Sequence, residues 1–438
     1  MSGANMLDTK KGRLSTFGIL YISEGIPLGF AAVAMATYMR RQGMDVAQVG
    51  AFVGAFYLPW AFKWAWAPLV DLISLNRIGG RKAWILICQA LMIVTLYAVS
   101  RIDHSNHFDL LVALVIVHNI FGATSDVAID SLAVNTLKAD ERGQGNGFMF
   151  GGAYIGQGLG GGGAMFVSDR FGFDVSFLYV SALLLVVWLF TLFFVKDPTA
   201  VSRAAEKSVE VWRKLKESLL GFLSQLYVGF FKSGSGPMVG VFFALLPFGA
   251  MALMSAVSTT LQVDIGMSDG QIAQLNVVNT VVAGLGCVAG GWLADRLGHR
   301  KMLAAFYAMT IIPTLYLAIM FSGESGIGSV SVTQYFVASV AFSACMGMHY
   351  GTSAAIFMGL TNPAVAATQF TGFMALRNLT ITYTNTWQGA AVDAWSYSTV
   401  FYLDAALAII PILVIPFLIE RKTKEVPPSR GAPLPEAG

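Results

Sequence analysis

The chain has 438 residues, of which 55% are hydrophobic and only 12% charged, and its mean hydropathy is +0.64. A soluble domain carries about 25% charged residues, because its surface must stay polar. The net charge of +3 is small and the basic residues are scattered, so no surface for nucleic acid is expected. Composition therefore excludes an ordinary soluble protein. It predicts an all-α polytopic membrane protein whose outer surface meets the lipid bilayer.

Apolar stretches long enough to cross a membrane recur along the whole chain. A hydrocarbon core of about 30 Å needs roughly 20 residues as a helix. We expect twelve such spans, at residues 14–38, 47–70, 83–101, 109–134, 145–167, 174–195, 238–262, 271–294, 302–322, 332–360, 369–391 and 399–419. Placing both termini in the cytoplasm puts 22 lysines and arginines in cytoplasmic segments and 4 in the opposite loops, which favours that orientation.

The first span contains an acid at bilayer depth. Glu24 directly precedes Gly25-Ile26-Pro27, and Pro27 predicts a kink because it cannot donate to the helix ladder. A charge at this depth costs about 2.5–3.5 kcal/mol on insertion scales, so it usually serves a function or has a partner. Glu24 is thus a candidate proton carrier or an anchor for a substrate amine. A permanent pair with another helix is the alternative.

The fourth span places Asn119, Asp126 and Asp130 on one stripe, because offsets of 7 and 11 residues return to nearly the same angle. Lys63 on the second span is the expected counter-ion. Arg81 and Lys82 are expected to reach Asp130 from the following loop. We interpret these residues as a charge cluster at a cytoplasmic gate, with protonation of Asp126 or Asp130 as a variant.

The fifth span holds ten glycines between Gly145 and Gly163, interrupted by Tyr154 and Gln157. Small residues let helices approach closely, which predicts packing against spans 1 and 8. A phosphate cradle is the alternative, but the run lacks the P-loop lysine and a preceding strand. Tyr154 and Gln157 are candidates for lining a central cavity.

A polar segment divides the chain into two parts. The predicted units are a six-helix bundle at 1–195, a linker at 196–237, a second six-helix bundle at 238–422 and a disordered tail at 423–438. The linker predicts a basic amphipathic helix over 206–231 that lies on the cytoplasmic lipid surface. Its inward-facing side chains are expected to be Trp212, Leu215, Leu219 and Phe222.

The second half has its own polar residues within predicted spans. These candidates for binding or coupling are Asn276, Asn279, His349, Tyr350 and Arg377, with Asn378, Tyr383 and Gln388 on the same span as the arginine. Arg377 can bind a substrate carboxylate or phosphate by two parallel hydrogen bonds, or it can pair with an acid on another span. His349 can titrate near neutrality, or it can be a hydrogen-bonded packing residue.

The halves repeat each other weakly, since Pro27-Leu28-Gly29 in span 1 matches Pro247-Phe248-Gly249 in span 7. Parallel six-helix repeats with a solute held between them are a transporter architecture. The loops after spans 2 and 8 carry the candidate gate residues Asp71, Arg81, Lys82, Asp295, Arg296, Arg300 and Lys301. Such charges can stabilise one conformation of a gate. Alternatively, they only set the orientation of the spans in the membrane.

The stretch Gly291–Lys301 resembles the signature of the major facilitator superfamily, G-x-x-x-D-R-x-G-[RH]-R-[RK]. Further phrases resemble the AmpG-like branch of that superfamily, among them Gly25-Ile26-Pro27-Leu28-Gly29, Lys63-Trp64-Ala65-Trp66-Ala67-Pro68 and Ser125-Asp126-Val127-Ala128-Ile129-Asp130. The resemblance implies a monomeric secondary transporter of the bacterial inner membrane. It also implies proton-driven import but does not fix the substrate. We expect a polar organic solute such as a muropeptide, and no cofactor or bound metal.

The sequence is also compatible with three other functions. A siderophore-uptake permease would have the same fold. A non-transporting sensor would signal through the linker or tail, and a membrane acyltransferase would use Asp126, Asp130 and His349.

Overall fold

The computed structural model describes residues 5–67, 70, 75, 79–102, 106–138, 141–197, 208–361 and 366–418. Within these ranges the chain forms helices and no strand. The predicted disordered tail at 423–438 lies outside the described residues.

The first half of the chain forms six helical rods. Two of them, the first and the fifth, contain a π-helical turn, η2 and η6. The elements of all six rods are η1 (Met6–Asp8), α1 (Lys10–Gly29), η2 (Phe30–Met35), α2 (Ala36–Arg41), α3 (Val46–Phe62), η3 (Lys63–Ala65), α5 (Arg81–Val99), α6 (Phe108–Thr136), α7 (Arg142–Gly158), η6 (Leu159–Gly163), α8 (Ala164–Phe171) and α9 (Phe173–Phe194).

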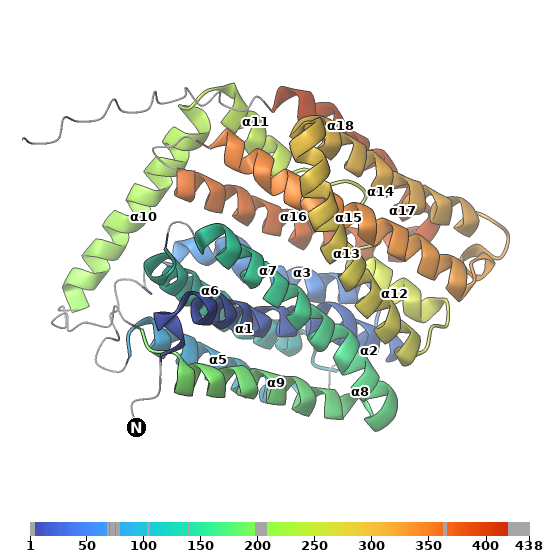
Figure 1. Cartoon of the computed structure of the whole chain (residues 1–438). Coiled ribbons are helices and arrows are strands. Elements are labelled where there is room, and N and C mark those ends of the chain that lie inside the picture. Colours follow the sequence, from blue (N-terminus) through green and yellow to red (C-terminus); the bar gives the residue numbers. More distant parts are fainter. Residues whose placement is uncertain are drawn as a thin grey trace, which may run out of the picture.

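The second half repeats this order after the linker helix α10 (Ser208–Phe231). Its elements are α11 (Ser235–Ala244), α12 (Ala256–Asp264), α13 (Asp269–Leu297), α14 (His299–Phe321), η7 (Gly326–Ser329), α15 (Val332–Leu360), α16 (Ala366–Ala394), α17 (Tyr397–Leu407), α18 (Ile409–Val414) and η9 (Ile415–Phe417). Figure 1 shows the helices of the first half gathered below those of the second, with α10 running up one side.

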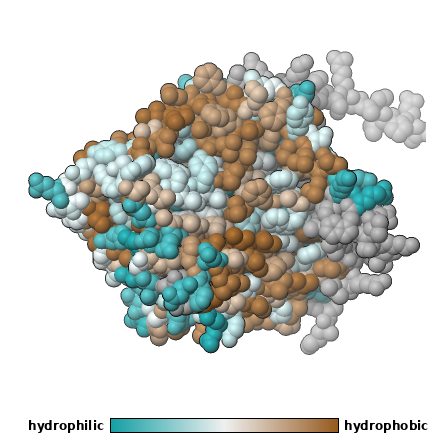
Figure 2. Space-filling model, turned by 180° about the vertical axis from the view of Figure 1, so that it is seen from behind, coloured by the Kyte–Doolittle hydropathy of each residue, from teal (hydrophilic) through white to brown (hydrophobic). Residues whose placement is uncertain are grey.

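Seven of the rods are both long and apolar enough to cross a membrane by themselves: Lys10–Arg41, Arg81–Val99, Phe108–Thr136, Phe173–Phe194, Asp269–Leu297, His299–Phe321 and Tyr397–Phe417. The other rods are shorter, interrupted or richer in glycine and polar residues. On the face seen in Figure 2, hydrophobic residues cover the middle and hydrophilic residues gather mostly toward the left and right margins. This distribution fits a protein whose central surface contacts the hydrocarbon core of a membrane.

The seventh predicted span, 238–262, is not one helix. The structure divides it into α11 and α12, joined by a non-helical segment at 245–255. Pro247 and Gly249 explain the break, because proline cannot continue the ladder and Gly249 adopts a positive φ of 89°. Pro27, the matching proline of span 1, lies inside the continuous helix α1, and the π-helical turn η2 follows it. The two halves therefore differ at this repeated motif.

The glycines of the fifth rod allow close helix packing, as the sequence predicts. The α7 rod packs along α1, and η6 and α8 pack against α13. A Cβ atom on Gly25 would collide with the carbonyl oxygen of Ala153, and one on Gly156 with that of Ile22. Only glycine permits this backbone approach.

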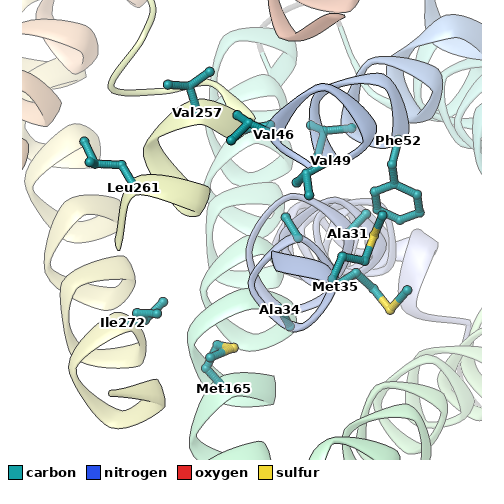
Figure 3. Close-up of a cluster of buried hydrophobic side chains, with 14 of the residues drawn as sticks. Ala31, Ala34, Met35, Val46, Val49, Phe52, Met165, Val257, Leu261 and Ile272 are labelled. Atoms are coloured by element: carbon teal, nitrogen blue, oxygen red, sulfur yellow. The ribbon is translucent and has the colours of Figure 1, made fainter. Parts of the chain in front are cut away.

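The two halves meet most closely at the end remote from α10. There α2 packs on α12 and α8 packs on α13, while α3 runs along α16. Arg40 pairs with Asp264 at 2.8 Å and Arg41 with Asp269 at 2.7 Å, each bond joining one half to the other. Figure 3 shows the apolar seal at this seam, with side chains of both halves in one cluster: Ala31, Ala34, Met35, Val46, Val49, Phe52, Met165, Val257, Leu261 and Ile272.

The linker helix α10 touches both halves. Phe222 stacks on Trp64 with ring centroids 5.5 Å apart, and Phe230 packs on Phe373 at 4.9 Å. Phe222 therefore faces inward, as predicted, and Leu219 is half-buried. The side chains of Trp212 and Leu215 lie outside the described part.

Candidate functional site

The charged residues of the first half meet between α6 and the end of α3. Lys63 Nζ donates to Asp126 Oδ2 in an ion pair, and Asp126 is only 3% exposed. The lysine nitrogen also lies 5.2 Å from the centroid of the Trp60 ring, whose indole N–H donates to Asn119 Oδ1 at 3.3 Å. The predicted pairing of Lys63 with Asp126 is present, and Asn119 shares this side of α6.

Glu24 lies on α1 beside the pair. It interacts electrostatically with Lys63, Asp126 and Asp130, and its Oε1 is buried with no hydrogen-bond partner in the described structure. Asp130 accepts a hydrogen bond of 2.5 Å from the hydroxyl of Tyr21, which lies one turn before Glu24 on the same helix. Three carboxyl groups are thus coupled to one lysine. Proton binding to one or two of these carboxyl groups can neutralise their excess negative charge.

Arg81 and Lys82 begin α5 at the same end of the bundle. Arg81 Nε donates to Ser131 Oγ at 2.6 Å, next to Asp130 in the sequence. Lys82 Nζ instead donates to the carbonyl oxygen of Leu192 at 2.7 Å. The expectation that Lys82 reaches Asp130 is wrong, because α5 packs against α9 and the free carbonyls at the end of α9 attract a cation.

In the second half, Arg377 of α16 is 7% exposed and lies between two aromatic rings. Its guanidinium carbon is 4.2 Å from the centroid of Phe248 and 5.6 Å from that of Phe357. Its Nη2 is buried without a hydrogen-bond partner, and no ion pair of Arg377 exists among the described residues. The predicted alternative of a structural acid partner on another span is therefore not found there.

His349 of α15 is fully buried near Arg377. Its ring lies 5.0 Å from that of Tyr307 and 6.1 Å from that of Phe248, and its Nε2 contacts the Met346 sulfur at 2.9 Å. The next residue, Tyr350, is 42% exposed. These positions place His349 in the aromatic packing around the arginine and leave Tyr350 accessible.

The remaining polar candidates lie where the fifth and eighth rods meet. Tyr154 Oη lies 3.8 Å from the Cys287 sulfur, and the Gly162 N–H donates to Asn276 Oδ1 at 2.9 Å. Asn279 Nδ2 donates to Ser339 Oγ at 2.9 Å, whereas its Oδ1 is buried without a partner in the described ranges. Gln157 is half-buried on α7. Asn276 therefore joins the halves, and Asn279 ties α13 to α15.

The loop after α13 carries its charges at the surface. Asp295 Oδ1 pairs with His299 Nε2 at 3.2 Å, and Arg296 stacks on Trp292 at 4.0 Å. Arg300 is exposed, and so is Lys301. Asp71, the candidate from the matching loop of the first half, lies outside the described residues.

Sequence reasoning missed Asp404, which is 1% exposed on α17. Its carboxylate accepts hydrogen bonds from the backbone N–H groups of Met251 and Ala252 at 2.7 and 2.8 Å, and from Gln388 Nε2 at 2.7 Å. An acid inside the apolar run 397–417 was the available clue. Asp404 holds the non-helical segment 245–255, on which Phe248 lies.

A second missed pair ties the start of α1 to the start of α7. Arg13 donates through Nε and Nη2 to Glu141 at 2.8 and 2.5 Å. The hydrogen bond from this guanidinium lowers the pKa of Glu141 to about 2. The pair is a structural contact at the end of the bundle that carries the N-terminus.

A model of the Major Facilitator Superfamily matches residues 17–381 and, in a second alignment, 238–437. The chain belongs to this superfamily. It is a multi-pass membrane transporter and not an enzyme.

Among curated proteins, the chain resembles the anhydromuropeptide permease of Escherichia coli strain K12, with 27% identity over 416 residues. The match covers 93% of this chain and 79% of the permease. The AmpG-like resemblance predicted from sequence phrases is therefore confirmed.

Among solved structures, the partially occluded inward-open conformation of the xylose transporter XylE from Escherichia coli matches with a TM-score of 0.69 and 12% identity, covering 96% of this chain and 99% of that one. A mutant of the nucleoside transporter NupG matches with a TM-score of 0.61 and 14% identity, covering 94% of this chain and all of that one. Both likenesses concern the fold.

Proposed function

We propose that this chain imports a polar organic solute of the anhydromuropeptide class across a bacterial inner membrane, driven by protons. The similarity to the anhydromuropeptide permease supports the solute class. The excess of lysines and arginines in the segments assigned to the cytoplasm supports termini on the inner side. We further propose that the protein works as a monomer.

The observation that carries proton coupling is the cluster of Glu24, Asp126 and Asp130 around Lys63. Asp126 has a fixed partner in the lysine, whereas one oxygen of Glu24 has none among the described residues. The free oxygen of Glu24 can therefore gain or lose a proton without breaking the Lys63–Asp126 ion pair. We assign Glu24 as the coupling acid, with Lys63 and Asp126 as the fixed pair that senses its charge.

Alternating access is supported by the uneven contact between the halves. The apolar seal and the ion pairs Arg40–Asp264 and Arg41–Asp269 lie at the end remote from α10. In this proposal they separate when the transporter opens to the other side, while the loop carrying Asp295 to Lys301 closes the cytoplasmic end.

Uptake into proteoliposomes tests the proposal. An imposed gradient, acid outside, should drive accumulation of a labelled anhydromuropeptide by the wild type. Glu24→Gln should abolish accumulation but keep exchange of solute across the membrane. Glu217→Gln, which changes an exposed glutamate of α10, should behave as wild type.

Equal accumulation with and without the gradient would contradict proton coupling, and unchanged accumulation by Glu24→Gln would remove that residue from the mechanism. Uptake of a ferric siderophore in place of the muropeptide would favour the siderophore permease.

A further inference from the structure

Arg377 is a buried cation whose hydrogen-bonding capacity is not met by the described protein. Its guanidinium is flanked by Phe248 and Phe357, which stabilise the charge through their ring faces. A ring face accepts no conventional hydrogen bond in the plane of the guanidinium, and Nη2 remains without a partner. A buried charge in this condition is costly unless a counter-ion joins it.

Two further unpartnered polar atoms lie around the same arginine. The hydroxyl of Tyr307 on α14 and Nδ1 of His349 on α15 are both buried without hydrogen-bond partners in the described ranges. Arg377 lies close enough to Tyr307 for a weak side-chain interaction that falls short of normal hydrogen-bond geometry, and its charge also acts on His349. Three helices thus bring three unmet polar groups to one place, and each can donate to an oxyanion, the histidine through its Nδ1–H tautomer.

We infer that Arg377, Tyr307 and His349 form a subsite that binds a carboxylate of the transported solute. This inference rests on the proposed transport function, and it adds that the solute must be anionic at one end. A carboxylate would receive the charge-assisted hydrogen bonds that the protein leaves unmade, and a guanidinium is suited to hold it.

The non-helical part of the seventh span covers one side of the subsite. Phe248 covers the guanidinium from the non-helical segment 245–255, and Gly249 beside it adopts a positive φ. The Asp404 carboxylate binds the backbone N–H groups of Met251 and Ala252, which follow Phe248 by three and four residues. Phe248 therefore lies on a short loop that is anchored close by. Displacement of one ring therefore exposes the subsite without melting a helix. Interrupted helices line solute sites in other transporters.

The subsite lies within the second half, and the next residue of the same helix contacts the first half. Asn378, next to Arg377, donates to the carbonyl oxygen of Trp60 at 3.5 Å, and Lys63 lies over the Trp60 ring. The subsite is thus linked through α16 and α3 to the charge cluster of the first half.

Calorimetric titration of the purified full-length protein in detergent tests the inference. The probes are an anhydromuropeptide with free carboxyl groups and the same compound with those groups amidated. The wild type should prefer the free acid by about 10- to 100-fold, the usual value of hydrogen bonds to a charged group. Arg377→Met should remove that preference, and Tyr307→Phe should reduce it by about tenfold or less.

The control variants change exposed charges far from the subsite. Arg213→Met and Glu217→Gln, both on α10, should keep the preference for the free acid. Equal affinity of the wild type for both probes would overturn the inference, as would an Arg377→Met variant that keeps the preference.

A second measurement tests carboxylate binding at the subsite independently of the identity of the transported solute. Sodium benzoate and sodium phosphate are titrated against thermal unfolding, with sodium chloride as the reference. Benzoate should raise the melting temperature of the wild type and leave that of Arg377→Met unchanged. An equal rise in the variant, or a response of the wild type to phosphate alone, would contradict a carboxylate subsite. Failure of muropeptide binding together with a positive benzoate result would refute the proposed solute and retain the subsite.

Discussion

In the first half of the molecule, the buried cation Lys63 pairs with Asp126. In the second half, the buried cation Arg377 meets aromatic rings and no carboxylate among the described residues. Lys63 begins η3, directly after α3, and Arg377 lies on α16, the helix that packs along α3. The buried cation of the first half therefore has its counter-ion within the protein, whereas the buried cation of the second half can accept a carboxylate from a bound solute.

Lys63→Met should be the most destabilising change. It leaves Asp126, which is 3% exposed, without its cation, and breaking one side of a buried pair costs about 3–5 kcal/mol. The double variant Lys63→Met/Asp126→Asn should recover much of this loss, since neither charge then remains. Thermal unfolding of the single and double variants measures the coupling. Additive losses would show that the two residues act independently.

Asp404→Asn should loosen the segment that carries Phe248. The variant loses charge-assisted hydrogen bonds from Met251 and Ala252, and each bond to a charged group contributes about 1.5–3 kcal/mol. We expect lower stability and faster hydrogen exchange confined to 245–255. Unchanged exchange in that segment would show that Asp404 is not its anchor.

Arg40→Gln should weaken the closed end of the seam by a smaller amount. The Arg40 side chain is 23% exposed and its pair with Asp264 joins the two halves, so about 1 kcal/mol or less is expected. A cysteine at the buried position Met267 should then label up to about fivefold faster with an impermeant thiol reagent. Arg101→Gln, an exposed arginine expected on the same side, serves as the control and should leave labelling unchanged.

Glu141 should make stability depend on acid pH. Arg13 lowers the pKa of Glu141 from an ordinary value near 4.5 to about 2. A lowered folded-state pKa means that the contribution to stability is complete above the ordinary value and is lost as the pH falls toward 2. Glu141→Gln should therefore flatten the decline in melting temperature between those values. An equally steep decline in the variant would assign the acid sensitivity to other groups.

The sequence predicted most of the helical order because apolar length and basic loops follow from the bilayer itself. The tenth span was predicted at 332–360, the bounds of α15. The seventh span was predicted as one continuous helix, because the residues at the helix break are as apolar as the helices on either side. Hydropathy therefore does not reveal the break. Pro247 and Gly249 mark the break only once the structure shows it.

The candidate site was predicted unevenly for a similar reason. Pairing of Lys63 with Asp126 follows from one acid-bearing stripe and one nearby cation. The surroundings of Arg377 depend on how α14, α15 and the broken span rotate against α16, which one sequence does not specify. Tyr307 and Phe248 were therefore not singled out, although each touches the environment of the arginine.

The thermal stability of Arg377→Met, compared directly with that of Lys63→Met in the same detergent and without solute, tests the central contrast. Removing an uncompensated buried charge should leave the melting temperature unchanged or raise it, because methionine fills similar space without the cost of a buried cation. Lys63→Met should lower it. A loss in Arg377→Met as large as that in Lys63→Met would show that Arg377 has a fixed counter-ion in the protein, and would contradict the account.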